Sequence, residues 1–251
     1  MTRLALRPDG GVRHAIGLDE ISNDLADWIA DDLVAPGLLD PVAFESTFVS
    51  VVCSTAPEPA AAWTAFYRNT LRELAAGGAA GGTNAGMAPV HERAAALAVG
   101  DVVELGCCFG FLSLRLAAAG HRVTAVDLSP GTVRLLASVA PALRASPGAG
   151  VRVLAGDALA VPLADRCADT VFAVHLLEHL PPPAGAAVLA EMLRLARRRV
   201  VVAVPYEYEP NPTWGHVRTF DAAALTALGA ATGRPFEVAS YHGGWLVVDT
   251  S

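Results

Sequence analysis

Two acidic residues stand at the ends of apolar segments near the middle of the chain, where they could bind a ligand. Glu104 is the last residue but one of the apolar segment 102–105, and Asp127 ends the apolar segment 123–127. A glycine turn at 106–110 and a helix-like stretch separate the segments, which predicts a strand, turn, helix and strand unit. Parallel strands end at a common edge of their sheet, where open α/β folds bind ligands. Asp127 is therefore predicted to accept hydrogen bonds from the hydroxyl groups of a ribose.

The spacing of the glycines indicates which kind of nucleoside ligand fits this turn. Asp127 follows Gly106 by about 20 residues, the separation expected for an acid that binds a ribose. A turn that cradles a pyrophosphate needs glycines at positions 106, 108 and 111, but Cys108 and Phe111 occupy the last two. The sequence also lacks the glycine and lysine motif of a P-loop. We therefore expect a ligand with a nucleoside but no pyrophosphate.

Two further strand-like segments end in polar residues. Asp157 follows the apolar segment 151–155, and His175 follows the segment 169–174. If these segments are parallel neighbours of the first two, their ends meet at the same edge of the sheet. Asp157 and His175 are therefore expected beside Asp127.

These motifs, in this order, resemble those of class I S-adenosylmethionine-dependent methyltransferases. The segment from Glu104 to Gly110 resembles the first motif of that family, with Cys108 in place of its middle glycine, and Asp127 matches its ribose-binding acid. The resemblance covers about residues 90–251. It implies S-adenosylmethionine as cofactor and an α/β, Rossmann-like fold whose seven-stranded sheet is mostly parallel, with an antiparallel C-terminal hairpin. The residues that it implies for cofactor binding are Glu104, Gly106, Cys108, Gly110, Asp127, Leu128, Asp157, Ala158 and His175.

Each of these acids has a simpler interpretation when it is considered alone. Glu104 could stabilise the N-terminus of a helix through the helix dipole. Asp127 could precede a helix cap at Ser129, and Asp157 could be an ordinary turn residue. Their joint occurrence, in order and at strand ends, favours the ligand site.

Histidines near the ends of two expected strands are candidates for catalysis. A sulfonium methyl group is already activated, so the protein must align an acceptor, exclude water and take up a proton if the acceptor is a hydroxyl. His175 and His216 are predicted for that proton transfer, with His179 as a third candidate. If neither of the first two acts, Glu207 or Glu209 is the next candidate. Any one of these histidines could instead be a polar surface group or a satisfied core group.

The segment 205–220 is unusually rich in aromatic, carboxylate, imidazole and guanidinium groups. Such a mixture suits an acceptor with apolar faces and many hydroxyls, because rings supply contact area and polar groups fix orientation. The alternative is an ordered loop whose aromatic side chains pack on the core. The residues predicted to bind the acceptor are Tyr206, Trp214, His216 and Arg218.

Four longer segments, taken together, resemble the mycofactocin oligosaccharide methyltransferases of actinobacteria. They are 104–111, 173–180, 213–221 and 242–247, and the resemblance spans nearly the whole chain. It implies methylation of the 2-hydroxyl of a glucose in the oligosaccharide of the redox cofactor mycofactocin. Two alternatives stay open: O-methylation of another natural product or metabolite, and a nucleoside-binding module without catalysis, for which Cys108 is the only indication.

The chain is expected to have two parts. Residues 1–88 contain three amphipathic helical patterns, within 21–33, 44–52 and 63–74, and are expected to form a helical region that packs on itself, or a cap over the acceptor site. The glycine-rich segment 77–86 is interpreted as a flexible linker or mobile loop. Residues 89–251 are expected to form the methyltransferase domain.

Periodicity predicts the elements of that domain. Strands are expected at 101–105, 122–127, 151–155, 169–174 and 199–204, with a terminal hairpin at 236–241 and 245–249. Helices are expected at 90–98, 111–119, 130–140, 184–197 and 220–231. The arginines at 194 and 197–199 are expected to end the fourth helix, where cations complement its dipole.

Composition narrows the partners and the compartment. The 251 residues carry a net charge of −7, which argues against a nucleic-acid partner because such proteins normally present a basic surface. No apolar run approaches the roughly 18 residues of a membrane span, and the first residues lack the apolar core of a signal peptide. The four cysteines show no C-x-x-C spacing, so we expect reduced thiols and a cytoplasmic location. No cluster of carboxylates and histidines has clear metal-ligand spacing, so no metal ligands are predicted and metal dependence stays open. The acceptor is expected to be a small molecule or an oligosaccharide, and the sequence does not indicate an oligomeric state.

Overall fold

A computed structural model describes residues 2–78, 81–143 and 150–251 of the protein. The chain forms two compact units, residues 1–89 and 90–251, and helix α4 (Gly82–Leu97) contains the boundary between them. The second unit holds all the residues predicted for cofactor, acceptor and catalysis, so its sheet is described first.

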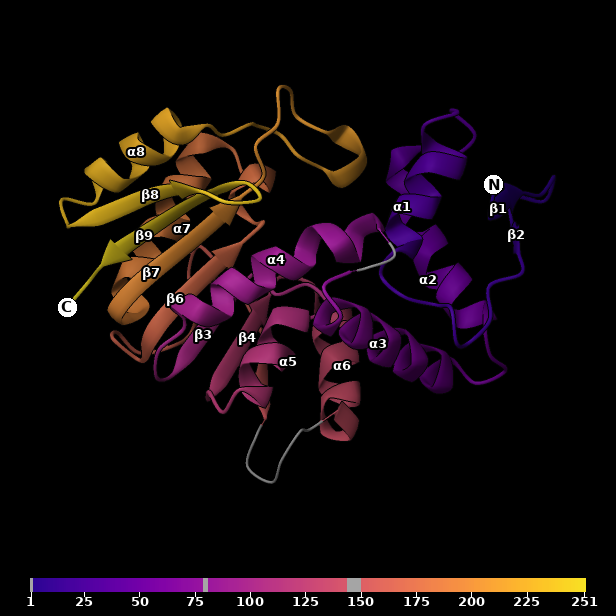
Figure 1. Ribbon diagram of the computed structural model, residues 1–251, viewed down its shortest axis with the longest axis horizontal. Helices are drawn as coiled ribbons and strands as arrows, with labels where there is room; N and C mark the ends of the chain where they lie inside the picture. The colour runs from indigo at the N-terminus through magenta and orange to yellow at the C-terminus, as the bar shows by residue number, and fades with distance from the viewer. Residues whose placement is uncertain (1, 79–80, 144–149) are drawn as a thin grey trace. The chain divides into compact units, whose positions relative to one another are not determined.

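The second unit is built on a seven-stranded sheet in the order β5-β4-β3-β6-β7-β9-β8 (Figure 1). Strands β3 to β7 are parallel, and β9 pairs antiparallel with both β7 and β8. The strands are β3 (Val102–Leu105), β4 (Val123–Asp127), β5 (Val151–Ala155), β6 (Ala168–Val174), β7 (Ala196–Val204), β8 (Phe236–Ser240) and β9 (Gly244–Asp249). This topology confirms the predicted Rossmann-like α/β fold with its antiparallel hairpin.

The order of the strands explains where a ligand site can form. The chain runs outward from β3 to β4 and β5, then returns to β6 on the other side of β3. Connections leave β3 and β6 in opposite directions, and ligands of open α/β sheets bind at such a reversal, beyond the carboxyl ends of the strands. We call this side of the sheet the carboxyl edge, meaning the edge at which β3 to β7 end.

Helices cover both faces of the sheet (Figure 1). Helices α5 (Phe111–Ala118) and α6 (Pro130–Val139) contact β4 and β5, whereas α7 (Pro182–Leu195) and α8 (Ala222–Ala231) contact β6 to β9. The core between α7, α8 and the sheet is apolar, and Met192, Leu195 and Leu225 in it have no exposed surface. Burial of several such side chains contributes about 1.5–3 kcal/mol each, so this layer holds the strand ends rigidly.

The first unit combines a short hairpin with helices. Its elements are β1 (Leu4–Leu6), β2 (Val12–His14), α1 (Leu25–Ile29), a π-helical turn (Ala30–Val34), a 3-10 turn (Pro41–Ala43), α2 (Phe44–Ser54) and α3 (Pro59–Ala75). Phe66 is fully buried at its centre and meets the rings of Phe48, Trp63 and Tyr67 edge to face. This aromatic core is formed by the helical stripes that the sequence predicts over residues 44–74.

The interpretation of residues 77–86 as a linker is wrong for residues 82–86, and residues 79 and 80 lie outside the described parts. Helix α4 begins at Gly82, although glycine is a poor helix former. Contacts distant in sequence compensate, because the Asn84 N–H donates to Asp24 Oδ1 at 2.7 Å and the Asn84 amide donates to Glu73 Oε2 at 2.5 Å. These anchors fix a segment whose composition alone favours mobility.

The expected end of the fourth helix is also wrong. Helix α7 ends at Leu195, and residues 197–199 belong to β7. Arg197 donates to Asp169 Oδ2 at 2.9 Å and to Asp101 Oδ2 at 3.0 Å, so carboxylates at neighbouring strand starts, and not a helix dipole, hold its charge. Of the four arginines, Arg194 alone lies in the last helical turn.

Within the described parts of the chain, every helix is too short or too polar to cross a membrane.

Candidate active site

The turn between β3 and α5 is tight and has left-handed backbone at three positions. The φ angles are 69° at Gly106, 48° at Cys108 and 73° at Gly110. A Cβ on Gly106 would lie 2.8 Å from a methyl group of Leu176, and one on Gly110 would lie 2.4 Å from a methyl group of Leu136. The positive φ angles and these close approaches therefore favour glycine at both positions. Cys108 adopts the same backbone region although it has a Cβ, and the residue is exposed.

Asp127 connects this turn to the tip of β4. Its Oδ2 accepts the backbone N–H of Cys108 at 2.8 Å, and its Oδ1 accepts the backbone N–H of Ser129 at 2.9 Å. A carboxylate has about four acceptor positions, so two remain for the hydroxyls of a ribose. The backbone hydrogen bond also accounts for the left-handed conformation of Cys108. The structure thus brings together Gly106, Cys108, Gly110 and Asp127, as the sequence predicts.

The remaining candidates for cofactor binding flank Asp127. Leu128 is 72% exposed, which is unusual for a large apolar side chain and suits a surface that covers a ligand. The Gly156 N–H donates to the Asp127 carbonyl at 2.9 Å, which places Asp157 and Ala158 beside the end of β4. Asp157 Oδ1 accepts the Leu159 N–H at 2.9 Å and so closes a local turn. The cofactor roles of these residues stay predictions.

Glu104 is buried beneath the turn and does not reach its surface. Only 4% of the residue is exposed, and its carboxylate accepts a hydrogen bond from the Ser113 hydroxyl of α5. Burial raises the pKa of Glu104 to about 7, against the lowering effect of the Ser113 hydrogen bonds. In this structure Glu104 ties the glycine turn to α5, and direct contact with cofactor stays a prediction.

The raised pKa of Glu104 makes stability depend on pH. Because the folded-state pKa lies above the ordinary value of 4.5, the folded protein favours the protonated form and loses stability as the pH rises from 4.5 through about 7. Replacing Glu104 with glutamine removes this loss. We expect the free energy of unfolding of Glu104→Gln, relative to the unchanged protein, to increase by roughly 3 kcal/mol between pH 4.5 and pH 8.5.

Urea unfolding across this pH range tests the expectation. Glu237→Gln, which changes an exposed acid on β8, is the matched control and should show no such pH-dependent difference. A constant difference between Glu104→Gln and the unchanged protein at all pH values contradicts the burial effect.

His175 directly follows the last residue of β6. It therefore lies at the carboxyl edge, where β6 is the neighbour of β3. Its φ of 51° is left-handed, and its backbone N–H donates to the Ala203 carbonyl of β7 at 2.9 Å. Burial, followed by the charges of His216 and His179, lowers the pKa of His175 to about 4. A non-glycine residue in this backbone region is strained, and such strain is often found at functional sites.

His216 lies in the loop after β7, where Glu207 orients its ring. The His216 Nδ1–H donates to Glu207 Oε2 at 2.7 Å, and the His216 side chain is 8% exposed. The ring of His179, in the 3-10 turn Leu177–His179, lies edge to face with that of His216 at a centroid distance of 4.9 Å. The structure therefore groups the predicted His216 with the third candidate, His179.

Glu178 completes a group that sequence spacing does not reveal. Ligand atoms of Glu178, His179 and His216 all lie within 4.8 Å of one another, so these residues could hold a metal ion. Burial raises the pKa of the Glu178 carboxyl to about 8, with the charge of Glu207 adding to the rise. The adjacent Glu178–His179 pair after a strand was a signal, but His216 comes from a distant loop.

The residues predicted for acceptor binding do not all face this group. Tyr206 is 39% exposed, and its hydroxyl lies 3.5 Å from Ser240 Oγ. Trp214 ends the 3-10 turn Pro212–Trp214, which precedes His216. Arg218 donates through Nε to the Leu177 carbonyl at 3.0 Å and lies over the Phe220 ring at 4.3 Å. Arg218 thus braces the loop against the turn that bears Glu178.

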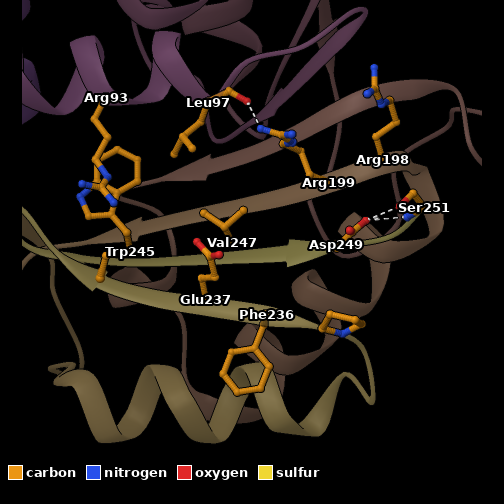
Figure 2. Close-up of a pocket in the computed structure, with 12 residues that line it drawn as sticks. Arg93, Leu97, Arg198, Arg199, Phe236, Glu237, Trp245, Val247, Asp249 and Ser251 are labelled. Atoms are coloured by element: carbon orange, nitrogen blue, oxygen red, sulfur yellow. Dashed lines mark hydrogen bonds between the residues drawn. The ribbon is translucent and has the colours of Figure 1, made fainter.

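A hollow of about 490 Å³ on the sheet contains none of the predicted site residues. Figure 2 shows it beside Arg93 and Leu97 of α4 and the strands β7, β9 and β8, with Arg199 Nη1 donating to the Leu97 carbonyl at 3.0 Å. Trp245 lies below Arg93, whose guanidinium is 5.1 Å from the indole centroid. The convergent strand ends, and not this hollow, carry the candidate active site.

Residues 102–199 match the sequence profile of the family described as "Methyltransferase domain". A ubiquinone biosynthesis O-methyltransferase of Bordetella pertussis is 33% identical over 102 residues, which cover 38% of this chain and 39% of that protein. An uncharacterized methyltransferase of Mycobacterium ulcerans is 29% identical over 49% of this chain and 46% of that protein. The chain thus spans less than half the length of these curated relatives.

Among solved structures, magnesium protoporphyrin IX methyltransferase from Synechocystis, crystallised with bound S-adenosylmethionine, is similar in fold. The TM-score is 0.54 at 21% identity, over 67% of this chain and 81% of that one. The sheet order and this likeness show the Rossmann-like fold of class I methyltransferases, and residues 102–199 of the chain match a methyltransferase domain. Its methyltransferase domain includes β3, β4, β5 and β6, the strands whose ends carry the candidate residues.

Proposed function

We propose that this protein is an S-adenosylmethionine-dependent O-methyltransferase that methylates a glucose 2-hydroxyl of the mycofactocin oligosaccharide. The observation that carries the proposal is that the Asp127 carboxylate and the His175 imidazole lie at one edge of the sheet. The acceptor itself rests on the sequence resemblance.

Bound S-adenosylmethionine supplies an electrophilic methyl group on a positively charged sulfur. Asp127 accepts the ribose hydroxyls, and the glycine turn brings backbone close to the nucleoside. His175 accepts the proton of the acceptor hydroxyl as that oxygen bonds to the methyl carbon and the bond from carbon to sulfur breaks. His175 is suited to this step because its lowered pKa leaves it neutral, with a lone pair, at neutral pH.

His216 is proposed to activate and orient the acceptor hydroxyl. Its Nδ1–H donates to Glu207, so a neutral ring presents the Nε2 lone pair on the opposite side. Tyr206 and Trp214 are proposed to supply contact area for the sugar faces, and Arg218 to hold the loop. This mixture of rings and polar groups supports a polyhydroxylated acceptor.

The proposal includes an accessory helical region in residues 1–88 and a catalytic domain in residues 89–251. The net charge of −7 supports an acceptor other than nucleic acid. The cysteine spacing supports a cytoplasmic location. A methyltransferase for another small metabolite is the second candidate, because the Bordetella pertussis relative is named as an O-methyltransferase of ubiquinone biosynthesis.

Transfer of an isotopically labelled methyl group tests the proposal. The protein is incubated with labelled S-adenosylmethionine and an extract that contains glycosylated mycofactocin, with an extract lacking that cofactor as control, and the products are analysed by mass spectrometry. We expect label on the glucose-bearing species. Cofactor binding without labelled product from that extract would reject the acceptor, and would direct the search to other hydroxyl acceptors.

A further inference from the structure

Three side chains from two separate segments of the chain converge beside the predicted catalytic histidine His175. Glu178 and His179 belong to the 3-10 turn after β6, and His216 belongs to the loop after β7. Their ligand atoms lie within 4.8 Å of one another. The loop is fixed to the turn, because the Val217 N–H donates to the Glu178 carbonyl at 2.9 Å. The fold therefore holds these three residues together.

Hydrogen bonds define the tautomer of both histidines in this group. The contact of His179 Nδ1 with the Gly215 carbonyl, at 3.3 Å, requires a proton on Nδ1, because a carbonyl oxygen only accepts. His216 Nδ1 likewise donates to the Glu207 carboxylate. In the neutral form both rings then have a lone pair on Nε2, the state in which histidine binds metals. A carboxylate behind a histidine ligand also orients the ring and raises its basicity.

The carboxylate of Glu178 provides independent support. Its side chain is 1% exposed, and within the described parts of the chain neither oxygen has a hydrogen-bond partner. His175 Nδ1 is 3.4 Å from Oε1, beyond a good hydrogen bond, and the charge of Arg218 acts on the carboxylate without a hydrogen bond to it. A buried, unpartnered carboxylate is costly unless a cation or a proton neutralises it. Two neighbouring imidazole lone pairs favour the cation.

We propose that Glu178, His179 and His216 bind a divalent transition-metal ion. Two imidazole nitrogens and one carboxylate form the protein ligand set of known catalytic zinc sites, which keep a further position open. Such nitrogen donors favour zinc, cobalt or nickel over calcium, magnesium and manganese, which prefer oxygen ligands. Ligands at about 2.1 Å stand roughly 3.4 Å apart in a tetrahedral site, so modest side-chain rotation closes the present separation.

The role of the ion rests on the proposed O-methyl transfer. An ion at this site binds the acceptor hydroxyl at its open position, and a vicinal diol of a sugar can supply two oxygens. Coordination makes the hydroxyl a stronger acid, as it does for metal-bound water. The proton then passes to His175, while the oxygen forms its bond to the methyl carbon and the sulfur keeps the electron pair. His216 thus acts on the acceptor through the ion.

Metal binding is tested first, without any acceptor. The full chain is treated with chelator, dialysed and titrated with Co²⁺, whose visible absorption reports tetrahedral or five-coordinate geometry, and with Zn²⁺ by calorimetry. We expect one site per chain in the unchanged protein, and loss of that site in His179→Ala and in Glu178→Gln. Absence of a site in the unchanged protein, or an unaltered site in both variants, overturns the proposal.

Two acids of the same loop give a matched comparison. Glu207→Gln should weaken metal binding about 10-fold to 100-fold, because it removes the partner of a ligand histidine. Glu209→Gln changes an exposed acid two residues away and should leave metal affinity unchanged. Equal metal affinity in these two variants contradicts the orienting role of Glu207 and with it the proposed ligand set.

Methyl transfer then separates the two proposals. Chelator treatment should abolish label transfer from S-adenosylmethionine, and Zn²⁺ or Co²⁺ should restore it. Full transfer after chelation, in protein shown to be metal-free, rejects the ion while keeping the O-methyltransferase. A metal site confirmed by titration, with no transfer to the glucose-bearing species, supports the site and rejects the proposed acceptor.

Discussion

Replacing Asp127 with alanine is expected to weaken S-adenosylmethionine binding by about 100-fold to 10,000-fold. The substitution removes the acceptors for two ribose hydroxyls, and charge-assisted hydrogen bonds contribute about 1.5–3 kcal/mol each. It also removes the acceptors of the Cys108 and Ser129 N–H groups, so the glycine turn loses its attachment to β4. Both losses act on the same ligand, which makes this the largest effect on affinity that we expect from one side chain.

Calorimetric titration with S-adenosylmethionine measures this effect. Asp249→Ala is a suitable control, because Asp249 ends β9, which runs antiparallel to β7 and so ends at the opposite edge of the sheet. This control should retain full affinity. Unchanged affinity in Asp127→Ala would remove the ribose assignment and leave Asp127 as a structural link between β4 and the turn.

Replacing His175 with alanine is expected to lower kcat by about 100-fold to 1000-fold and to lower cofactor affinity far less. General base catalysis contributes about this factor, and the base acts only when the acceptor reacts. The backbone of His175 donates to Ala203 in either variant, so the end of β6 should keep its place. Alanine at a φ of 51° costs some stability, which thermal unfolding would register separately from turnover.

The comparison of kcat with binding distinguishes catalysis from positioning. His121→Ala serves as control, because His121 is a partly exposed histidine before β4, at the opposite edge of the sheet. It should leave both kcat and cofactor affinity unchanged. Normal turnover in His175→Ala would rule out its role as base. If His216→Ala also turned over normally, Glu207 or Glu209 would become the candidate.

Much of the fold follows from the sequence because its strands are short apolar runs that end in glycine or acid. The run into Asp127 and the glycines at 106 and 110 define two adjacent strands and the turn between them. The start of α4 could not be predicted from the sequence, because contacts from Asp24 and Glu73 override the low helix propensity of its glycines. The start of β7 did not follow either, since ion pairs to Asp101 and Asp169 draw Arg197 into a strand.

The candidate site likewise contains residues that the sequence could place and residues that it could not. Residues at strand ends could be placed from local pattern, because a parallel sheet aligns those ends whatever the loops do. The grouping of Glu178 with His216 depends on the path of the loop after β7. A left-handed Gly215, with φ of 72°, and a cap by the Asn211 side chain on the Thr213 N–H set that path. No periodicity in the sequence reports such a path, so the metal ligands could not be recognised from spacing.

Strand β9 has a consequence for the order in which the protein forms during synthesis. Residues 244–249 follow β8 in the chain, yet they lie between β7 and β8 in the sheet. Until these residues leave the ribosome, β7 exposes an unpaired edge and β8 has no strand to join. Exposed strand edges promote association with other chains. The nascent protein is thus open to misassembly until β9 is free to pair, although the residues of the candidate active site precede β9 in the chain.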